Sequence, residues 1–225
     1  ALPLGMVGTR GGAVTDATDG RGRTNGGEPS PPRSVARLDS PESTALASQA
    51  VVFDDLQYVL MCCEHLVTAL DSPTSGAVKV SSDPAVVEAL WTGALVGYAR
   101  CFSGRLGVLT DQDVQSLDLG EQTMTFHSAV KKLRDHYASR HVNPRETITV
   151  GVALKTDGAP HGVAVTSIPN PSVDAAAVRL LGRIAYGLSG TVDARMQQAQ
   201  GAVLAAATAM PLAELRRLPQ YQVTP

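Results

Sequence analysis

The chain has 225 residues, of which 44% are hydrophobic and 18% are charged, enough to form one folded domain with a sizeable core. Its formal net charge of -2 gives no overall electrostatic reason to bind nucleic acid or an anionic membrane, so any such binding has to be local. The absence of a long uncharged apolar run and of a basic start before a hydrophobic block predicts no membrane span and no signal peptide, and a cytoplasmic location.

The first part of the chain differs in composition from the rest. Residues 1 to about 44 are rich in Gly, Pro, Ser and Thr and contain no aromatic residue, so they cannot bury enough apolar surface to offset the entropy lost on ordering. We therefore expect a disordered tail over residues 1–44 and a helical domain over residues 45–219.

The first predicted helix runs from about Thr44 or Leu46 to Leu70. Its apolar positions advance in steps of three and four, which is the pattern of a bundle seam; they are Phe53, Leu56, Leu60, Cys63, Val67 and Leu70. Cys62 and Cys63 are adjacent within it and match no disulfide or zinc spacing, so we interpret them as small core residues in a reducing compartment, with a redox-active pair as the minor alternative.

A second helix is predicted to start at Ser82-Asp83-Pro84, where an N-cap residue precedes a proline. It is apolar nearly all round as far as Phe102 and should be the most buried helix. Arg100, near its end, needs a partner, which is either a carboxylate such as Asp54 or Asp55 or the phosphate of a ligand. Residues 105–120 are predicted to form a loop.

The segment from Phe126 to Val142 combines apolar rhythm, basic charge and titratable side chains. On a helix, the core stripe is predicted to consist of Phe126, Val130, Leu133 and Tyr137. His127, Arg134 and His141 recur every seven residues and would line one flank of this stripe. A half-desolvated imidazole can act as acid or base, and a guanidinium can hold a phosphate. The alternative is that these are solvated side chains or ordinary ion pairs.

A local basic patch follows in the same segment. It contains five cations and one carboxylate, which gives a formal charge of +4: Lys131, Lys132, Arg134, Arg140 and Arg145 against Asp135. A solvated helix face accounts for the patch as well as RNA binding does. No carboxylate pair, nucleophile motif or metal-ligand cluster accompanies it, so a metal and a cofactor are not expected.

Two short β-branched runs, Thr147 to Leu154 and Val163 to Ile168, flank Asp157-Gly158 and predict a hairpin. A long Ala-rich helix is predicted from Ser172 onwards, with Gly187 and Gly190 as possible kinks. The predicted fold is mainly α: a four-helix bundle with a short β-hairpin inserted before the long last helix.

The runs GYARCFSGR and FHSAVKKLRDHYASRHVNPRE, in this order of elements, resemble the HEPN superfamily (higher eukaryotes and prokaryotes nucleotide-binding domain), and in particular its abortive-infection proteins of the AbiV kind. In the resemblance, Arg134, Asp135 and His141 correspond to the family's Arg, polar residue and His. The gap before His141 is at the long end of the family's range, and the alternatives are His136 or an adjustment of the backbone at the end of the helix.

The resemblance implies a metal-independent endoribonuclease that acts as a toxin or antiviral effector and works as a homodimer with a shared active site. The implied catalytic residues are Arg134, His141 and Asp135, and the residues expected to bind RNA are Arg100, His127, Lys131 and Arg140. An antitoxin or another protein partner is then expected as well. The alternative function is a non-catalytic HEPN-like module that binds a partner protein or a nucleotide.

Overall fold

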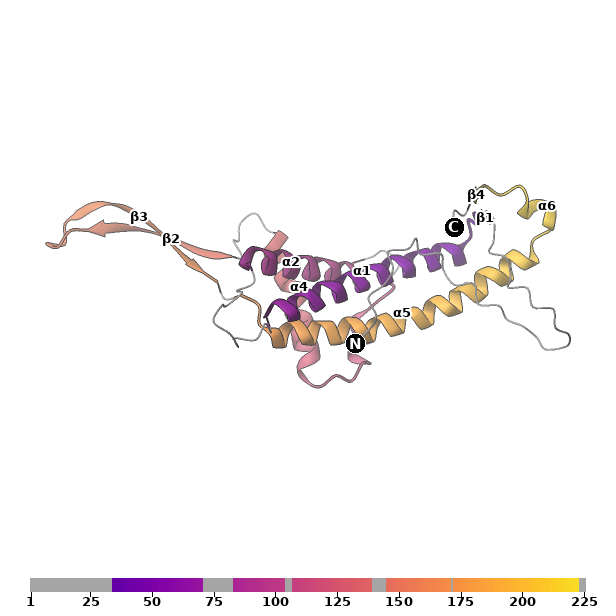
Figure 1. Ribbon diagram of the computed structural model, residues 1–225, viewed down its shortest axis with the longest axis horizontal. Helices are drawn as coiled ribbons and strands as arrows, with labels where there is room; N and C mark the ends of the chain where they lie inside the picture. The colour runs from indigo at the N-terminus through magenta and orange to yellow at the C-terminus, as the bar shows by residue number, and fades with distance from the viewer. Residues whose placement is uncertain (1–33, 71–82, 104–106, 139–144, 171, 223–225) are drawn as a thin grey trace. The chain divides into compact units, whose positions relative to one another are not determined.

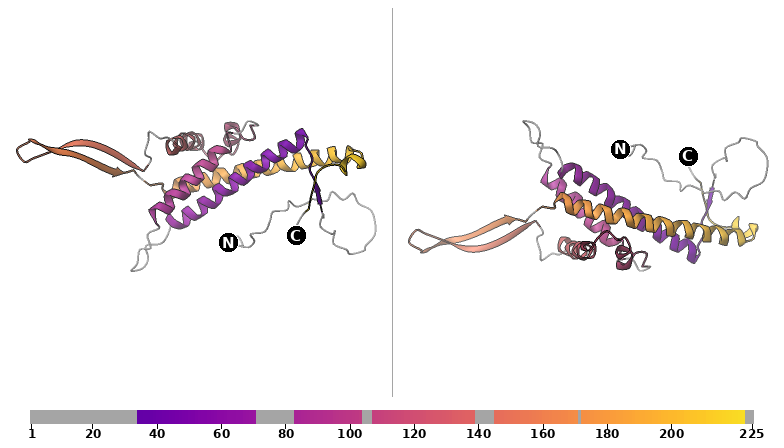
Figure 2. Two further views of the ribbon diagram at one scale, coloured as in Figure 1. Left: turned by 90° about the horizontal axis from the view of Figure 1, so that it is seen from above. Right: turned by 90° about the horizontal axis from the view of Figure 1, so that it is seen from below.

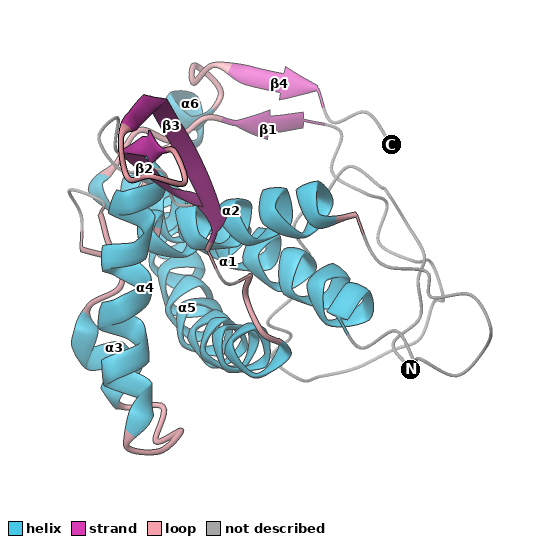
Figure 3. Cartoon of the chain, turned by 90° about the vertical axis from the view of Figure 1, so that its left-hand side faces the viewer, coloured by secondary structure: helices cyan, strands magenta, loops and turns pink. Residues whose placement is uncertain are grey.

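The computed structural model describes residues 34–70, 83–103, 107–138, 145–170 and 172–222. The fold is mainly helical with a β-hairpin, as predicted (Figures 1 and 3). The described residues form four longer helices, α1 (Pro41–Leu70), α2 (Pro84–Arg100), α4 (Gln122–Ala138) and α5 (Ala175–Ala209), together with the short helices α3 (Asp111–Gln115) and α6 (Leu212–Leu215).

The chain divides into two compact units. One comprises residues 1–35 and 220–225, and its described part contributes to a two-stranded sheet of β1 (Ser34–Ala36) and β4 (Gln220–Gln222). The other unit, Ala36–Pro219, contains every described helix and the hairpin. Most of the predicted tail, residues 1–33, lies outside the described residues.

Helix α1 begins at Pro41, a few residues before the predicted start. Ser40 and Ser43 exchange hydrogen bonds, because each backbone N–H donates to the other's hydroxyl at 2.9 and 3.2 Å. This reciprocal pairing satisfies backbone donors that a helix start otherwise leaves open, and Pro41 is suited to the first helical position. The Ser-Pro signal therefore sets the boundary.

The core is formed largely between α1 and α5, which run antiparallel along each other (Figure 2). Gln57 donates to Ser189 at 3.4 Å, whereas Cys63, farther along α1, lies against Gly182, earlier in α5. The buried residues of α5 lie in its first half, from Val178 to Val192. The helix is continuous through both glycines at which a kink was considered.

Helix α2 packs against α1 through two glycines. A Cβ on Gly97 would lie 3.1 Å from Val59 Cγ2, and one on Gly93 would lie 2.7 Å from the Tyr58 hydroxyl. The missing side chains allow the helices to approach closely. Seven of the 17 residues of α2 are buried, a larger share than the six of 30 in α1 or the seven of 35 in α5, as predicted.

The hairpin consists of β2 (Glu146–Leu154) and β3 (Pro160–Pro169), paired antiparallel. Gly158 in the connection has φ of +83°, a backbone conformation that favours glycine, and Lys155 and Ala159 close the turn with a 2.8 Å hydrogen bond. The predicted strands are thus confirmed. Within the described part of the chain, all but two of the residues in these strands are exposed.

The segment predicted as a loop over residues 105–120 contains α3, so that prediction is wrong for Asp111–Gln115. The Asp113 carboxylate accepts a 2.7 Å hydrogen bond from the Thr110 backbone N–H, which caps the helix. Val114 is fully buried and anchors this turn in the core.

Candidate nucleic-acid interface

Helix α4 carries most of the residues that the sequence indicated as functional. Its predicted core stripe is confirmed: Val130 is 2% exposed, and Phe126, Leu133 and Tyr137 pack partly buried against the core. The inward face is wider than that stripe, because His127 is fully buried too. Two of the three predicted flank residues, His127 and Arg134, can therefore be located relative to the core.

His127 is held on both sides of its ring. Nδ1 lies 2.7 Å from the hydroxyl of Tyr98 on α2, and Nε2 lies 3.0 Å from Oδ1 of Asp111 on α3. Because a carboxylate only accepts, Nε2 carries a proton and donates it to Asp111, and in that tautomer Nδ1 accepts from Tyr98. Burial strongly raises the pKa of Tyr98, which keeps this donor protonated.

The surroundings of His127 are aromatic. Its ring meets Phe102 edge-on at 4.7 Å and Tyr98 at 5.6 Å between centroids. With both nitrogens bonded and no exposed surface, His127 joins α4 to α2 and α3 and does not reach a ligand. Its role in the structure is to position α4, and it takes no part in the site proposed below.

Lys131, one turn beyond His127, lies at the edge of this network. Its Nζ is 2.8 Å from Asp111 Oδ1 and 5.5 Å from the centroid of the Phe102 ring. Hydrogen bonds from Lys131 and then His127 lower the pKa of Asp111. Lys131 is thus positioned by a carboxylate and an aromatic face, and its side chain is 38% exposed.

A hollow of about 420 Å³ lies between the end of α2 and α4, and we call it the α2–α4 hollow. Three cationic side chains and one carboxylate line it, alongside small and aromatic residues: Ala99, Phe102, Ser103, Ser128, Lys131, Lys132, Arg134 and Asp135. The basic patch predicted from the sequence thus contributes three neighbouring cations to one concave surface.

Of the three cations in the hollow, Lys132 is exposed, whereas Lys131 and Arg134 are partly buried. The side chain of Arg134 is 38% exposed, and its Nε lies 3.0 Å from Asp135 Oδ1. The N–H does not point at that oxygen, so this buried Nε makes an ion pair without a hydrogen bond. Asp135 itself is 67% exposed, so water also solvates its carboxylate.

Of the other predicted site residues, those that the structure describes lie outside the α2–α4 hollow. Arg100 pairs with Asp55 at 3.3 Å, which confirms the carboxylate alternative and leaves the arginine outside the lining of the hollow. Burial raises the pKa of Asp55, and Arg100 opposes that change. His136 is exposed, about 200° around the helix from Arg134. Arg140 and His141 lie outside the described residues.

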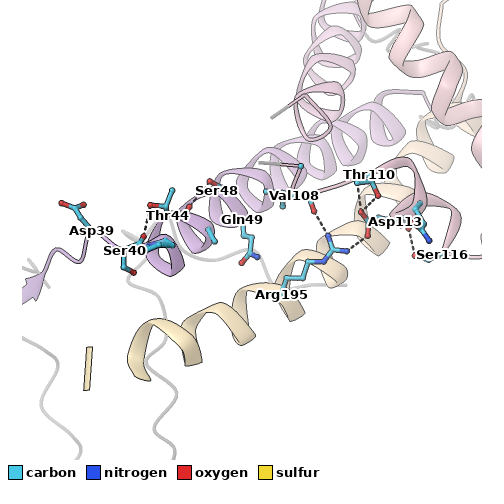
Figure 4. Close-up of a pocket in the computed structure, with 14 residues that line it drawn as sticks. Asp39, Ser40, Thr44, Ser48, Gln49, Val108, Thr110, Asp113, Ser116 and Arg195 are labelled. Atoms are coloured by element: carbon cyan, nitrogen blue, oxygen red, sulfur yellow. Dashed lines mark hydrogen bonds and ion pairs between the residues drawn. The ribbon is translucent and has the colours of Figure 1, made fainter. Parts of the chain in front are cut away.

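A larger pocket, of about 1150 Å³, lies beside the start of α1 (Figure 4). Arg195 of α5 extends to the α3 segment, where it donates to the Val108 carbonyl at 2.5 Å and to the Asp113 carboxylate. Partial burial alone would raise the pKa of Asp113, but the hydrogen bonds from Arg195 and Thr110 lower it. Both bonds of Arg195 are internal, so the residue links α5 to α3.

The contact of Arg195 with Val108 and Asp113 was not predicted from the sequence. The Thr110-x-x-Asp113 spacing is a helix-start signal that could have indicated α3. Arg195 follows buried Val192 by three residues, a spacing that puts it on the same side of α5.

The three cysteines are free and buried. Burial raises the pKa of Cys62, and raises that of Cys63 and Cys101 to about 12. A thiol with such a pKa is rarely ionised near neutrality, which favours the structural interpretation of Cys62 and Cys63 over a redox-active pair.

Comparisons with protein-family models, with curated proteins and with solved structures found no match to this chain. Among the residues that the structure describes, no three His, Cys, Asp or Glu side chains gather in a way that could hold a metal ion. Nor does any described helix combine the length and the apolar character needed to cross a bilayer.

Proposed function

We propose that the chain is a metal-independent endoribonuclease of the HEPN type, which holds an RNA phosphate at the α2–α4 hollow and acts in the cytoplasm as a toxin or antiviral effector. The observation that carries the proposal is the position of Arg134. Its side chain is partly desolvated, paired with Asp135 and flanked by two lysines on one concave surface. A guanidinium in such a place is suited to bind a phosphate through two hydrogen bonds.

Cleavage without a metal uses the nucleophile that RNA carries itself. A base removes the proton of the 2′-hydroxyl, the 2′-oxygen bonds to phosphorus, and the bond from phosphorus to the 5′-oxygen breaks as an acid protonates the leaving oxygen. The products are a 2′,3′-cyclic phosphate and a free 5′-hydroxyl. Arg134 stabilises the charge that gathers on the phosphorane, and imidazole supplies the acid and the base.

The proposal assigns the acid and base to His141, contributed by both chains of a homodimer. One copy of the site offers one such histidine, whereas the reaction needs two proton transfers. A twofold interface brings equivalent residues of two chains together, so a dimer can supply both. A protein partner that restrains the toxin, an antitoxin, belongs to the same proposal.

One observation favours the second candidate, a non-catalytic HEPN-like module that binds a nucleotide or a partner protein. Neither described histidine of α4 lines the hollow: both nitrogens of His127 are engaged inside the core, and His136 is exposed about 200° around the helix from Arg134. The three cations of the hollow can bind an anion without any acid or base.

The test measures RNA cleavage and RNA binding separately. Purified protein is incubated with a mixed-sequence single-stranded RNA in excess chelator, beside Arg134→Ala, His141→Ala and His136→Ala variants of equal helical content. Arg183→Ala, which removes an exposed arginine of α5 that lines neither pocket, is the matched control. Binding of a fluorescent RNA is followed by anisotropy.

For the nuclease we expect Arg134→Ala and His141→Ala to lose cleavage by about 100-fold or more, the size typical of one electrostatic contact to a transition state, while His136→Ala and Arg183→Ala stay active. Binding that Arg134→Ala weakens, with no cleavage by any version, would support the binding module. An RNA that neither binds nor is cleaved would contradict the nuclease and the nucleic-acid-binding form of the module.

A further inference from the structure

The hairpin has one apolar face that no part of the described chain covers. Residues that pair directly across the strands lie on the same face, so Val150 is beside Val165 and Val152 beside Val163. Six large aliphatic side chains share this face, each 57–76% exposed: Ile148, Val150, Val152, Leu154, Val163 and Val165. The opposite face carries mainly small and polar side chains, with the pairs Thr149–Thr166 and Gly151–Ala164, and its one large aliphatic residue is Ile168 at the base of the hairpin, 62% exposed.

Exposing six aliphatic side chains on one face is unfavourable for a hairpin surrounded by water. An isolated pair of strands is marginally stable at best and needs a further layer over its hydrophobic face. These strands are nine and ten residues long, well above the usual five or six, and β-branched along the apolar side. A long, regular, aliphatic face of this kind indicates a surface that is buried in an assembly.

We propose that the occupant of this face is the same face of a second copy of the chain, packed across a twofold axis near the Val150–Val165 pair. Each protomer offers about 600 Å² of aliphatic surface, taking roughly 100 Å² per side chain, or about 1,200 Å² in total. That total reaches the lower end of the range for specific interfaces. This interface holds the two Glu146 ends apart, so it is separate from the twofold contact that a shared active site requires, and the inference does not rest on nuclease activity.

Charge is also compatible with self-association. The aliphatic positions carry none, and the one carboxylate at the base, Glu146, accepts a 2.7 Å hydrogen bond from Ser167. A twofold axis at the centre of the strands places the Glu146 end of one hairpin opposite the Leu154 end of the other, next to Lys155. The two Glu146 carboxylates thereby lie at opposite ends of the interface and do not repel each other.

The first experiment measures the oligomeric state of the full chain, without RNA, by sedimentation velocity over a range of protein concentrations. The test variant is Val150→Lys/Val165→Lys, which puts two charges at the centre of the apolar face. Thr149→Lys/Thr166→Lys is the matched control, since it adds the same charge to the neighbouring cross-strand pair on the opposite face. Circular dichroism verifies that each variant keeps its helices.

We expect wild type and the threonine-pair control to dimerise, and the valine-pair variant to dissociate at least about 100-fold more readily, because two ammonium groups of each chain would be buried. A monomeric wild type, or a valine-pair variant that dimerises as well as the control, would overturn the proposal. Because no RNA is present, failure here is distinct from failure of the nuclease test.

A second measurement does not depend on any substitution. Amide hydrogen exchange of β2 and β3 in the wild-type chain is expected to slow as protein concentration rises, while exchange of the buried part of α1 stays constant. Protection of the strands that is equal in samples whose dimer content differs by sedimentation would refute the dimer. Protection that appears only with lipid vesicles would assign the face to a membrane and refute it equally.

Discussion

The buried hydrogen bond between Tyr98 and His127 should contribute substantially to the free energy of unfolding, because breaking it leaves a polar atom unpaired in the core. Replacing His127 with Leu keeps a similar volume but leaves the buried Tyr98 hydroxyl without its 2.7 Å partner and removes the 3.0 Å bond to Asp111. An orphaned buried hydroxyl costs about 1–3 kcal/mol. With the second bond, we expect a loss of about 2–3 kcal/mol in the free energy of unfolding, or roughly 4–12 °C in Tm.

The assay is urea unfolding of four proteins: wild type, His127→Leu, Tyr98→Phe and the double variant. Tyr98→Phe alone should cost about 1–2 kcal/mol because Nδ1 is left unpaired. The double variant should be more stable than the sum of the single changes predicts, by about 1 kcal/mol or more, since neither polar atom is then orphaned. His136→Leu, the same substitution at an exposed position of α4, should stay within about 0.5 kcal/mol of wild type. Additive losses, or a His127→Leu loss no larger than that of His136→Leu, would refute the reasoning.

Two further predictions concern the core. Gly97→Ala should be about 1–2 kcal/mol less stable to urea unfolding than Gly93→Ala. A Cβ at Gly97 would meet Val59 and Tyr58 at 3.1 and 3.3 Å within the packed helices. A Cβ at Gly93 would meet chiefly the tip of the Tyr58 side chain, which is exposed. Both changes gain the same helix propensity, so equal stabilities would contradict the close approach of α1 and α2. Iodoacetamide at pH 8 should label the native chain at least about 100-fold more slowly than the urea-unfolded chain, since the three thiols are buried and burial raises the pKa of Cys63 and Cys101 to about 12. Rapid labelling of any one cysteine in the native protein would be incompatible with this packing.

The order of elements was predictable because it depends on local signals. The Asp83-Pro84 start of α2, the alternating β-branched runs of the hairpin and the long Ala-rich pattern of α5 each specify an element on their own. The missed element, α3, has only five residues, too few to show a periodicity, and its capping residues Thr110 and Asp113 were its one visible sign.

The candidate site was harder to predict, because it depends on which face of a helix a neighbouring element covers. Spacing placed His127 and Arg134 on the flank of the α4 stripe, but it could not show that α2 and α3 enclose His127 while leaving Arg134 at the rim of a hollow. Arg100 was expected to need a partner, and the choice of Asp55 depended on how α2 lies across α1. Arg195 was missed because its partners, Val108 and Asp113, are remote in the sequence.

The antiparallel pairing of α1 with α5 has a consequence for how the chain is made. Helix α1 ends at Leu70 and its main packing partner begins only at Ala175. A ribosome adds about 5–20 residues per second, so the interval between the two helices amounts to roughly 5–20 s of synthesis. Through that interval Leu56, Val59 and Leu66 have only α2 to cover them, and the nascent chain presents an aliphatic stripe that is a natural substrate for chaperones.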